Sequence, residues 1–290
     1  MTLIKYRSDN AEAAVGYLED DLIHEVPGVA SISEALRLSA AELASAVESR
    51  LPAHLSLQEV TLLAPVDGRM EVWAAGVTYR RSREARMTES EHEADVYSRV
   101  YEADRPELFF KSAAWRVRGH GQTIAVREDS PVNVPEPELA LVVNTAGDVV
   151  GYSVCNDVSS RSIEGDNPLY LPQAKVYLGG CAVGPGIRLA GAVGDATNLG
   201  FSVQVTRGRS VVWEDSASTS GLARTFGDLV GYLRRSDTFP DGVILSTGTC
   251  LVPDLPFTLE PKDTVSITVE QIGTLSNTVV SGLTAMWESM

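Results

Sequence analysis

Two acidic residues open an apolar run at residues 135–143, which read PEPELALVV. The run has the length and the branched side chains of a buried β-strand. Because side chains alternate between the two faces of a strand, Glu136 and Glu138 are predicted to project from the same face. Residues 144–148, NTAGD, have the composition of a hairpin turn, after which the chain would return through a second strand to Asp157.

This hairpin predicts a cluster of three carboxylates. A turn centred between Ala146 and Gly147 pairs positions whose numbers sum to 293, which places Asp157 opposite Glu136. Residues directly opposite each other share a face, with Cβ atoms about 4.5–5.5 Å apart. Three ionised carboxylates at this spacing repel, so either one of them is protonated or a cation lies among them. All-oxygen ligation suits Mg²⁺, with Mn²⁺ and Ca²⁺ as alternatives.

The same residues also allow a structural interpretation. Glu136 and Glu138 could be solvated acids at the end of an edge strand, with Asp157 in a turn or cap. A shift of one residue in the hairpin register would separate the three side chains.

Composition narrows the classes of function. The chain has 290 residues, 44% of them hydrophobic, and 24 basic against 39 acidic residues give a net charge of −15. Such a chain lacks the basic surface that binds nucleic acid or an anionic membrane, so we expect neither partner. An acidic substrate would need a local cation to hold it against the field of the protein.

Localisation is predicted from the cysteines and the N-terminus. Cys155, Cys181 and Cys250 are odd in number and widely spaced, which indicates neither a disulfide framework nor a zinc site. The first residues lack an apolar leader segment, and no window reaches the about 18 apolar residues that a membrane span requires. We expect a soluble cytoplasmic protein.

A small domain is predicted to precede the main one. Residues 1–30 read as short strands and turns, and residues 31–51 have helical periodicity. The apolar segment that follows ends in Pro65, Asp67 and Gly68, which is typical of a boundary. The prediction is a small N-terminal α/β domain at residues 1–66 and a catalytic domain at residues 67–290.

The main domain is rich in predicted strands. Helices are expected to be fewer and to lie chiefly at residues 83–101 and 225–235. Strands separated by Gly, Pro and Asp turns favour a β-rich α+β fold over alternating βαβ units. The expected strands lie at residues 71–79, 107–112, 123–127, 138–143, 149–159, 202–208, 243–249 and 264–275.

An ordered series of short motifs across residues 70–280 resembles the fumarylacetoacetate hydrolase superfamily. Within it, the likeness is strongest to the dehydratases of 2-keto-3-deoxy-D-arabinonate or xylonate, through longer strings such as RPELFFK at 105–111 and NPLYLPQAK at 167–175. The other motifs are GVTY at 76–79, PEPELA at 135–140, GY at 151–152, NDVSSR at 156–161, GP at 184–185 and STGT at 246–249.

The resemblance implies a mixed β-roll catalytic domain that acts on a small 2-keto acid as a homodimer or homotetramer. It implies a divalent ion, Mg²⁺ first, held by Glu136, Glu138 and Asp157. Two departures stand out: hydrolytic members carry a water-activating His where this chain has Ser82, and the acid that follows the arginine at position 161 is replaced by Ser162.

The catalytic residues implied by the resemblance are Lys175 and Glu107. Lys175 could stabilise an enolate oxygen as an ammonium, act as a base, or form a Schiff base, and the sequence leaves these roles open. Glu107 would carry a proton at C3 or C4. Five further residues are expected to bind substrate: Ser82, Arg86, Lys111, Gly248 and Thr249.

The leading hypothesis is a metal-dependent lyase that removes water from a 2-keto-3-deoxy sugar acid and yields 2,5-dioxopentanoate. Its rival is a hydrolase or decarboxylase that cleaves acylpyruvate-like diketo acids, and Ser82 in place of His argues against that rival. A catalytically silent relative that binds keto acids is the third hypothesis.

Overall fold

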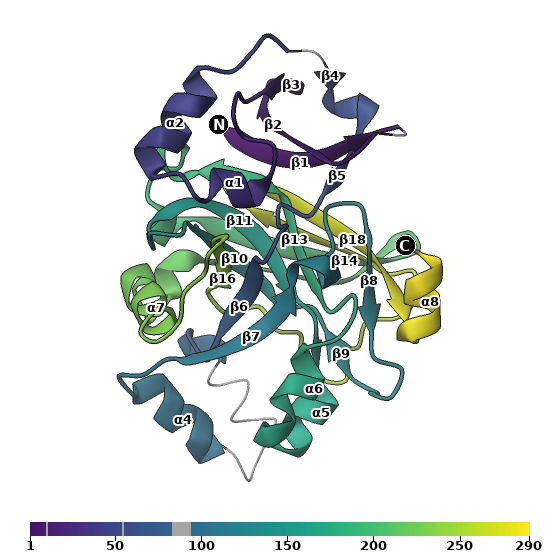
Figure 1. The fold of residues 1–290 in the computed structure, drawn as a ribbon. Helices are drawn as coiled ribbons and strands as arrows, with labels where there is room; N and C mark the ends of the chain where they lie inside the picture. Colours follow the sequence, from purple (N-terminus) through teal and green to yellow (C-terminus); the bar gives the residue numbers. More distant parts are fainter. Residues whose placement is uncertain (10, 54, 83–93) are drawn as a thin grey trace.

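The structure is a computed structural model that describes residues 1–9, 11–53, 55–82 and 94–290 (Figure 1). Its strands are β1 (Thr2–Ser8), β2 (Ala14–Glu19), β3 (Leu22–Glu25), β4 (Leu55–Ser56), β5 (Val60–Leu63), β6 (Glu71–Gly76), β7 (Glu107–Ala113), β8 (Thr123–Val126), β9 (Asn133–Val134), β10 (Pro137–Val143), β11 (Val149–Asp157), β12 (Ser159–Ser160), β13 (Cys181–Leu189), β14 (Gly200–Arg207), β15 (Ser210–Ser218), β16 (Val243–Ser246), β17 (Thr264–Val269) and β18 (Gly273–Ser281).

The α-helices of the described chain are short. They are α1 (Ile32–Ala35), α2 (Ala40–Glu48), α4 (Ala94–Glu102), α5 (Arg161–Asp166), α6 (Leu171–Lys175), α7 (Phe226–Leu233) and α8 (Gly282–Glu288). None of these helices in the described part of the chain is long and apolar enough to cross a membrane.

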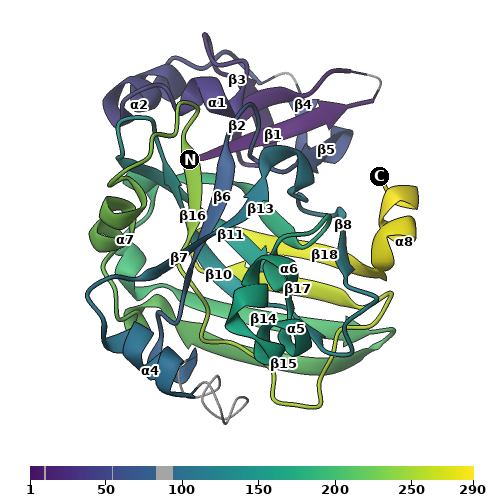
Figure 2. The same ribbon diagram turned by 60° about the horizontal axis from the view of Figure 1, so that its bottom comes forward.

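Two large sheets organise the described part of the chain. The first runs in the order β4-β3-β2-β1-β13-β11-β10-β16-β6-β7, with β5 added beside β1, and the second in the order β15-β14-β17-β18-β8. A buried apolar cluster from β10, β11, β14, β17 and β18 fills the space between them. Figures 1 and 2 show α7 on the outside of the first sheet, whereas α6 contacts β7. The α+β fold predicted from the sequence is confirmed.

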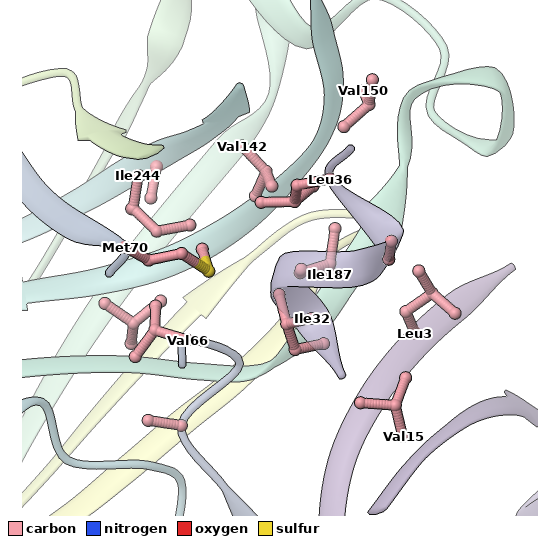
Figure 3. Close-up of a cluster of buried hydrophobic side chains, with 14 of the residues drawn as sticks. Leu3, Val15, Ile32, Leu36, Val66, Met70, Val142, Val150, Ile187 and Ile244 are labelled. Atoms are coloured by element: carbon pink, nitrogen blue, oxygen red, sulfur yellow. The ribbon is translucent and has the colours of Figure 1, made fainter. Parts of the chain in front are cut away.

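The N-terminal segment packs directly on the first sheet. Leu3 of β1, Ile32 of α1 and Leu36, which follows α1, meet Val142 of β10 and Ile187 of β13 in one buried cluster (Figure 3). Strand β1 also pairs with β13 and so continues the sheet. The domain boundary between residues 66 and 67 remains a prediction.

Two predicted elements are each divided in the structure. The helix expected at residues 31–51 is two helices, because the Ser39 side chain and Glu42 form a capping box that begins α2. The strand expected at residues 264–275 is the hairpin of β17 and β18, whose turn includes Gln271 at a φ of 62°. Of the helix expected at residues 83–101, α4 covers the end, and residues 83–93 lie outside the described residues.

The sequence reading missed the central strand β13. This strand contains Gly184, Pro185 and Gly186, which are normally signals against a strand. Gly186 is required because a Cβ there would lie 2.6 Å from the carbonyl oxygen of Leu3 on the neighbouring strand. The close approach of the β1 backbone therefore explains why a strand contains glycine at a position where the sequence suggests a turn.

Candidate active site

Strands β10 and β11 pair in the predicted register. Pro137 pairs with Asn156 and Glu138 with Cys155, and both pairs sum to 293. Nearer the turn, Val143 pairs with Val149, and this pair sums to 292, so the centre of the turn lies half a residue before the predicted one. A bulge between Val142 and Val143 restores the predicted register. The Asp157 N–H donates a hydrogen bond of 3.0 Å to the Glu136 carbonyl, so these two residues lie side by side at the end of the hairpin.

The predicted convergence of the three carboxylates is confirmed. Glu136, Glu138 and Asp157 each offer one oxygen, and these oxygens lie within 4.8 Å of one another. All three residues are buried, with at most 2% of their surface exposed. Burial raises the pKa of the Glu138 carboxyl well above its usual range, and the nearby charges of Asp157 and Glu136 raise it further.

Strand β16 and the loop after it hold Glu138 in place. The Ser246 hydroxyl donates to Glu138 Oε2 at 2.5 Å, and the Gly248 N–H donates to the same oxygen at 2.9 Å. Gly248 has a φ of 90°, and a Cβ there would lie 2.1 Å from Thr78 Oγ1, so only glycine fits. The sequence predicted that Gly248 binds substrate. In the structure its N–H donates to Glu138 instead.

Lys175 lies in the middle of the cluster. Its Nζ donates to Glu136 Oε2 at 2.7 Å, to Asp157 Oδ2 at 3.1 Å and to Ser159 Oγ at 2.5 Å. The residue ends α6, and its buried side chain also lines the pocket described below. Three acceptors around one nitrogen suit an ammonium, which favours electrostatic stabilisation over Schiff-base formation among the three roles considered.

Lys111 occupies a different place from the one predicted. Its fully buried Nζ lies against Asp157 Oδ1 and donates to two backbone carbonyls, those of Val158 and Lys175. Lys111 is not one of the described residues that line the pocket. The geometry places Lys111 behind the carboxylates rather than in contact with a substrate.

Arg161 and Glu164 complete the charged cluster, and the sequence reading assigned neither of them a role. The Arg161 guanidinium lies 3.6 Å from Glu136 Oε1 and donates to Glu164 Oε2 at 3.0 Å. Both residues belong to α5, where the three-residue spacing brings them together. Arg161 therefore has a carboxylate partner even though Ser162 replaces the acid expected beside it.

The carboxylates open into one pocket, and the empty space of about 340 Å³ in and above it includes open solvent. Glu107 on β7 lines it and lies over Gly76, where a Cβ would be 2.1 Å from Glu107 Oε2. Ser82 and Thr249, both predicted to bind substrate, also line the pocket and are almost fully buried. Arg86 lies outside the described residues. The remaining lining residues include Val77, Tyr97, Phe109 and Glu164.

Comparisons with known proteins agree on one protein family and on dehydratases within it. The family model described as fumarylacetoacetate (FAA) hydrolase C-terminal matches residues 71–280. A probable 2-keto-3-deoxyxylonate dehydratase of Haloferax volcanii is 50% identical over 217 residues, which cover 75% of this chain and 74% of the relative. The 2-dehydro-3-deoxy-D-arabinonate dehydratase of Saccharolobus solfataricus is 40% identical over 222 residues, covering 76% of this chain and 74% of the relative.

A solved structure extends the likeness to the whole fold. It is a 2-keto-3-deoxy-D-arabinonate dehydratase complexed with magnesium and 2,5-dioxopentanoate, and it superposes with a TM-score of 0.84 at 32% sequence identity. The match covers 97% of this chain and 99% of that one. The similarity therefore includes the N-terminal segment, which lies outside the match to the family model.

Proposed function

This chain belongs to the fumarylacetoacetate hydrolase family, and from that premise and the geometry of the site we propose that it is a Mg²⁺-dependent dehydratase. The substrate is a 2-keto-3-deoxy sugar acid such as 2-keto-3-deoxy-D-arabinonate or xylonate, and the product is 2,5-dioxopentanoate. In the D series these two substrate names denote one compound. Oxidation at C2 and loss of the C3 hydroxyl remove the stereocentres that distinguish the two sugars, and only C4 remains.

The charge balance of the site is the observation that carries the proposal. Glu136, Glu138 and Asp157 bring three negative charges, and Lys111 and Lys175 bring two positive ones. Arg161 and Glu164 cancel each other, so with all three carboxylates ionised, as metal ligands are, the cluster carries one excess negative charge. A divalent cation together with a keto-acid monoanion adds one positive charge and balances it.

The donor set also fits Mg²⁺. Three carboxylate oxygens within 4.8 Å of one another are hard ligands of the kind that Mg²⁺ prefers, and they leave room for substrate oxygens. Glu136, Glu138 and Asp157 would hold the ion, which when bound would polarise the substrate keto oxygen and so acidify C3. Mn²⁺ and Ca²⁺ are the alternatives with the same ligand preference.

The remaining residues of the pocket handle charge and protons. The Lys175 ammonium stabilises negative charge as it develops on the substrate oxygen. Glu107 lies within the same pocket and carries the proton between C3 and the departing C4 hydroxyl. Loss of water leaves an unsaturated keto acid, and proton shifts from its C5 hydroxymethyl group then give the aldehyde of the product. Ser82 and Thr249 offer hydroxyl groups to the substrate.

The test is a product assay on metal-stripped protein. With Mg²⁺ and 2-keto-3-deoxy-D-arabinonate, we expect 2,5-dioxopentanoate by proton NMR, no product when EDTA is present, and slower turnover of the enantiomer at C4. An acylpyruvate serves as the second substrate, because the rival hydrolase would release pyruvate from it. Pyruvate release without any dehydration would overturn the proposal.

We also infer a homodimer or homotetramer and a cytoplasmic location. Several large apolar side chains are exposed, among them Trp115 at 63% and Leu169 at 84%. Contact with further copies of the chain would cover such side chains. The three cysteines are buried thiols, as a reducing compartment favours. Light scattering during gel filtration tests the assembly, and cell fractionation tests the location.

A further inference from the structure

Lys111 joins three segments of the chain behind the active site. Its ammonium lies against the Asp157 carboxylate, which ends β11, and against the Val158 carbonyl that follows. It also donates at 2.6 Å to the carbonyl of Lys175, the last residue of α6. The three acceptors match the three N–H bonds of an ammonium, and Lys111, unlike Lys175, is not among the described residues that line the pocket.

The surroundings make this arrangement rigid. The Lys111 side chain is 0% exposed, and its Nζ lies 5.7 Å from the centre of the Tyr177 ring. The Tyr177 hydroxyl donates at 3.2 Å to the same Val158 carbonyl that Lys111 contacts. Burial raises the pKa of the Tyr177 phenol, so it remains a neutral donor. Burying an ammonium is costly, and here a carboxylate and two carbonyls offset that cost.

We propose that Lys111 is a positioning residue, which fixes the Asp157 carboxylate and the backbone of Lys175 relative to each other. One ammonium sets the distance between a predicted metal ligand and the lysine that stabilises charge on the substrate. The kinetic part of this inference rests on the proposed function, whereas the part that concerns metal affinity does not. A displacement of about 1 Å at such a site costs about 100-fold in turnover.

The variant Lys111→Met removes the ammonium and keeps the length of the side chain. We expect kcat at saturating Mg²⁺ to fall about 100-fold, with KM changed by less than about threefold. A rise in KM at unchanged kcat would overturn the proposal, because it would place Lys111 in contact with the substrate.

Magnesium affinity gives a second measurement that needs no turnover. Loss of a positive charge beside Asp157 would by itself strengthen Mg²⁺ binding, whereas loss of positioning weakens it, by about tenfold or more. Calorimetric titration of Lys111→Met with Mg²⁺ separates the two. Weaker binding supports the proposal, and unchanged or tighter binding contradicts it. If the wild type binds Mg²⁺ but turns over no keto acid, the proposed function fails while this comparison still stands.

Lys5 provides a matched control. Its Nζ also contacts one carbonyl, that of Val66 at 2.8 Å, and one carboxylate, that of Asp67 at 3.3 Å, but at the N-terminal segment away from the pocket. Lys5→Met should lower the melting temperature and leave kcat and Mg²⁺ affinity within twofold of the wild type. Equal losses of kcat in both variants would reduce Lys111 to a general stabilising role and overturn the proposal.

Tyr177→Phe covers the case in which Lys111→Met does not fold. It removes one hydroxyl from the Val158 carbonyl and leaves the buried charges intact. We expect kcat to fall severalfold while the protein remains folded. Unchanged kcat in a folded Tyr177→Phe variant would contradict the proposal.

Discussion

Glu138 and Asp241 are both almost completely buried carboxylates, and their surroundings shift their pKa values in opposite directions. Asp241 accepts hydrogen bonds from the Arg37 guanidinium at 2.7 Å and from the Arg69 N–H at 2.8 Å. These partners hold its pKa well below the usual range. Glu138 faces Asp157 and Glu136 instead, and burial and their charges raise its pKa.

The difference separates a structural cluster from a functional one. The cluster around Asp241 is satisfied by the protein's own cations and joins the N-terminal segment to the turn before β16. The cluster around Glu138 lacks positive charge, because two lysines face three carboxylates. A folded protein keeps such a deficit at a cost in stability, which is expected where a cation binds as part of the function.

The largest expected effect comes from removing a carboxylate of the site. Glu136→Gln should lower turnover by about 1,000-fold or more, since a metal ion supplies several kcal/mol of transition-state stabilisation. Initial rates of 2,5-dioxopentanoate formation measure it. Asp241→Asn is the control and should keep turnover within about threefold of the wild type. Equal activity in Glu136→Gln and the wild type would contradict the functional role given to the carboxylate cluster around Glu138.

The second effect concerns stability at Asp241. Asp241→Asn should lower the free energy of unfolding by about 2 kcal/mol at neutral pH, because charge-assisted hydrogen bonds are lost. The pKa of Asp241 is lowered in the folded state, so its contribution is present above its unfolded value near 3.8 and is lost as the pH falls through the folded value.

Urea unfolding at several pH values checks this prediction. The wild type should lose part of its stability on acidification below about pH 4, and the variant should show a flatter dependence. Identical acid dependence in the two proteins would contradict the role given to Asp241.

The third effect has the opposite sign. In metal-free protein at neutral pH, Glu138→Gln should raise the free energy of unfolding by about 1 kcal/mol, since a neutral amide replaces a carboxyl that must take up a proton when the chain folds. The pKa of Glu138 is raised in the folded state, so its favourable contribution is present below the unfolded value near 4.5 and is lost as the pH rises through the folded value. The variant should gain most at neutral pH, and a loss of stability there would show that the cluster is already balanced.

The smallest expected effect concerns the contribution of Arg37 to the cluster around Asp241. The Arg37 side chain is 52% exposed, so its ion pair with Asp241 is screened by water. Arg37→Ala should lower the unfolding free energy by less than Asp241→Asn does, because the N–H and guanidinium of Arg69 still satisfy the carboxylate. A cost equal to that of Asp241→Asn would instead make Arg37 the main partner.

Strand periodicity predicted the carboxylate cluster because it needs only local information. The alternation of Glu136 and Glu138 and the hairpin pairing with Asp157 follow from a period of two and one turn. The same alternation places Lys111 on the face of Glu107, but it cannot tell what covers that face. Only the packing of α6 and of Val158, which follows β11, shows that Lys111 is enclosed.

Sequence reading failed where distant segments decide the structure. Strand β13 was missed because its Gly184-Pro185-Gly186 segment serves contact with β1, which is far away in the sequence. The pairing of Arg161 with Glu164 is a local three-residue spacing and could have been predicted once α5 was recognised. The resemblance to the family supplied the roles of Lys175 and Glu107, which no periodicity could indicate.

Calorimetric titration of the metal-free protein with Mg²⁺ at neutral pH tests whether Glu136, Glu138 and Asp157 hold a divalent ion. We expect one Mg²⁺ per chain, with proton release from the site as Glu138 ionises, seen as a dependence of the binding heat on the buffer. Glu138→Gln should bind Mg²⁺ more weakly and release no proton. Absence of saturable binding to the wild type, or equal binding by the two proteins, would contradict the claim that these three carboxylates hold a divalent ion.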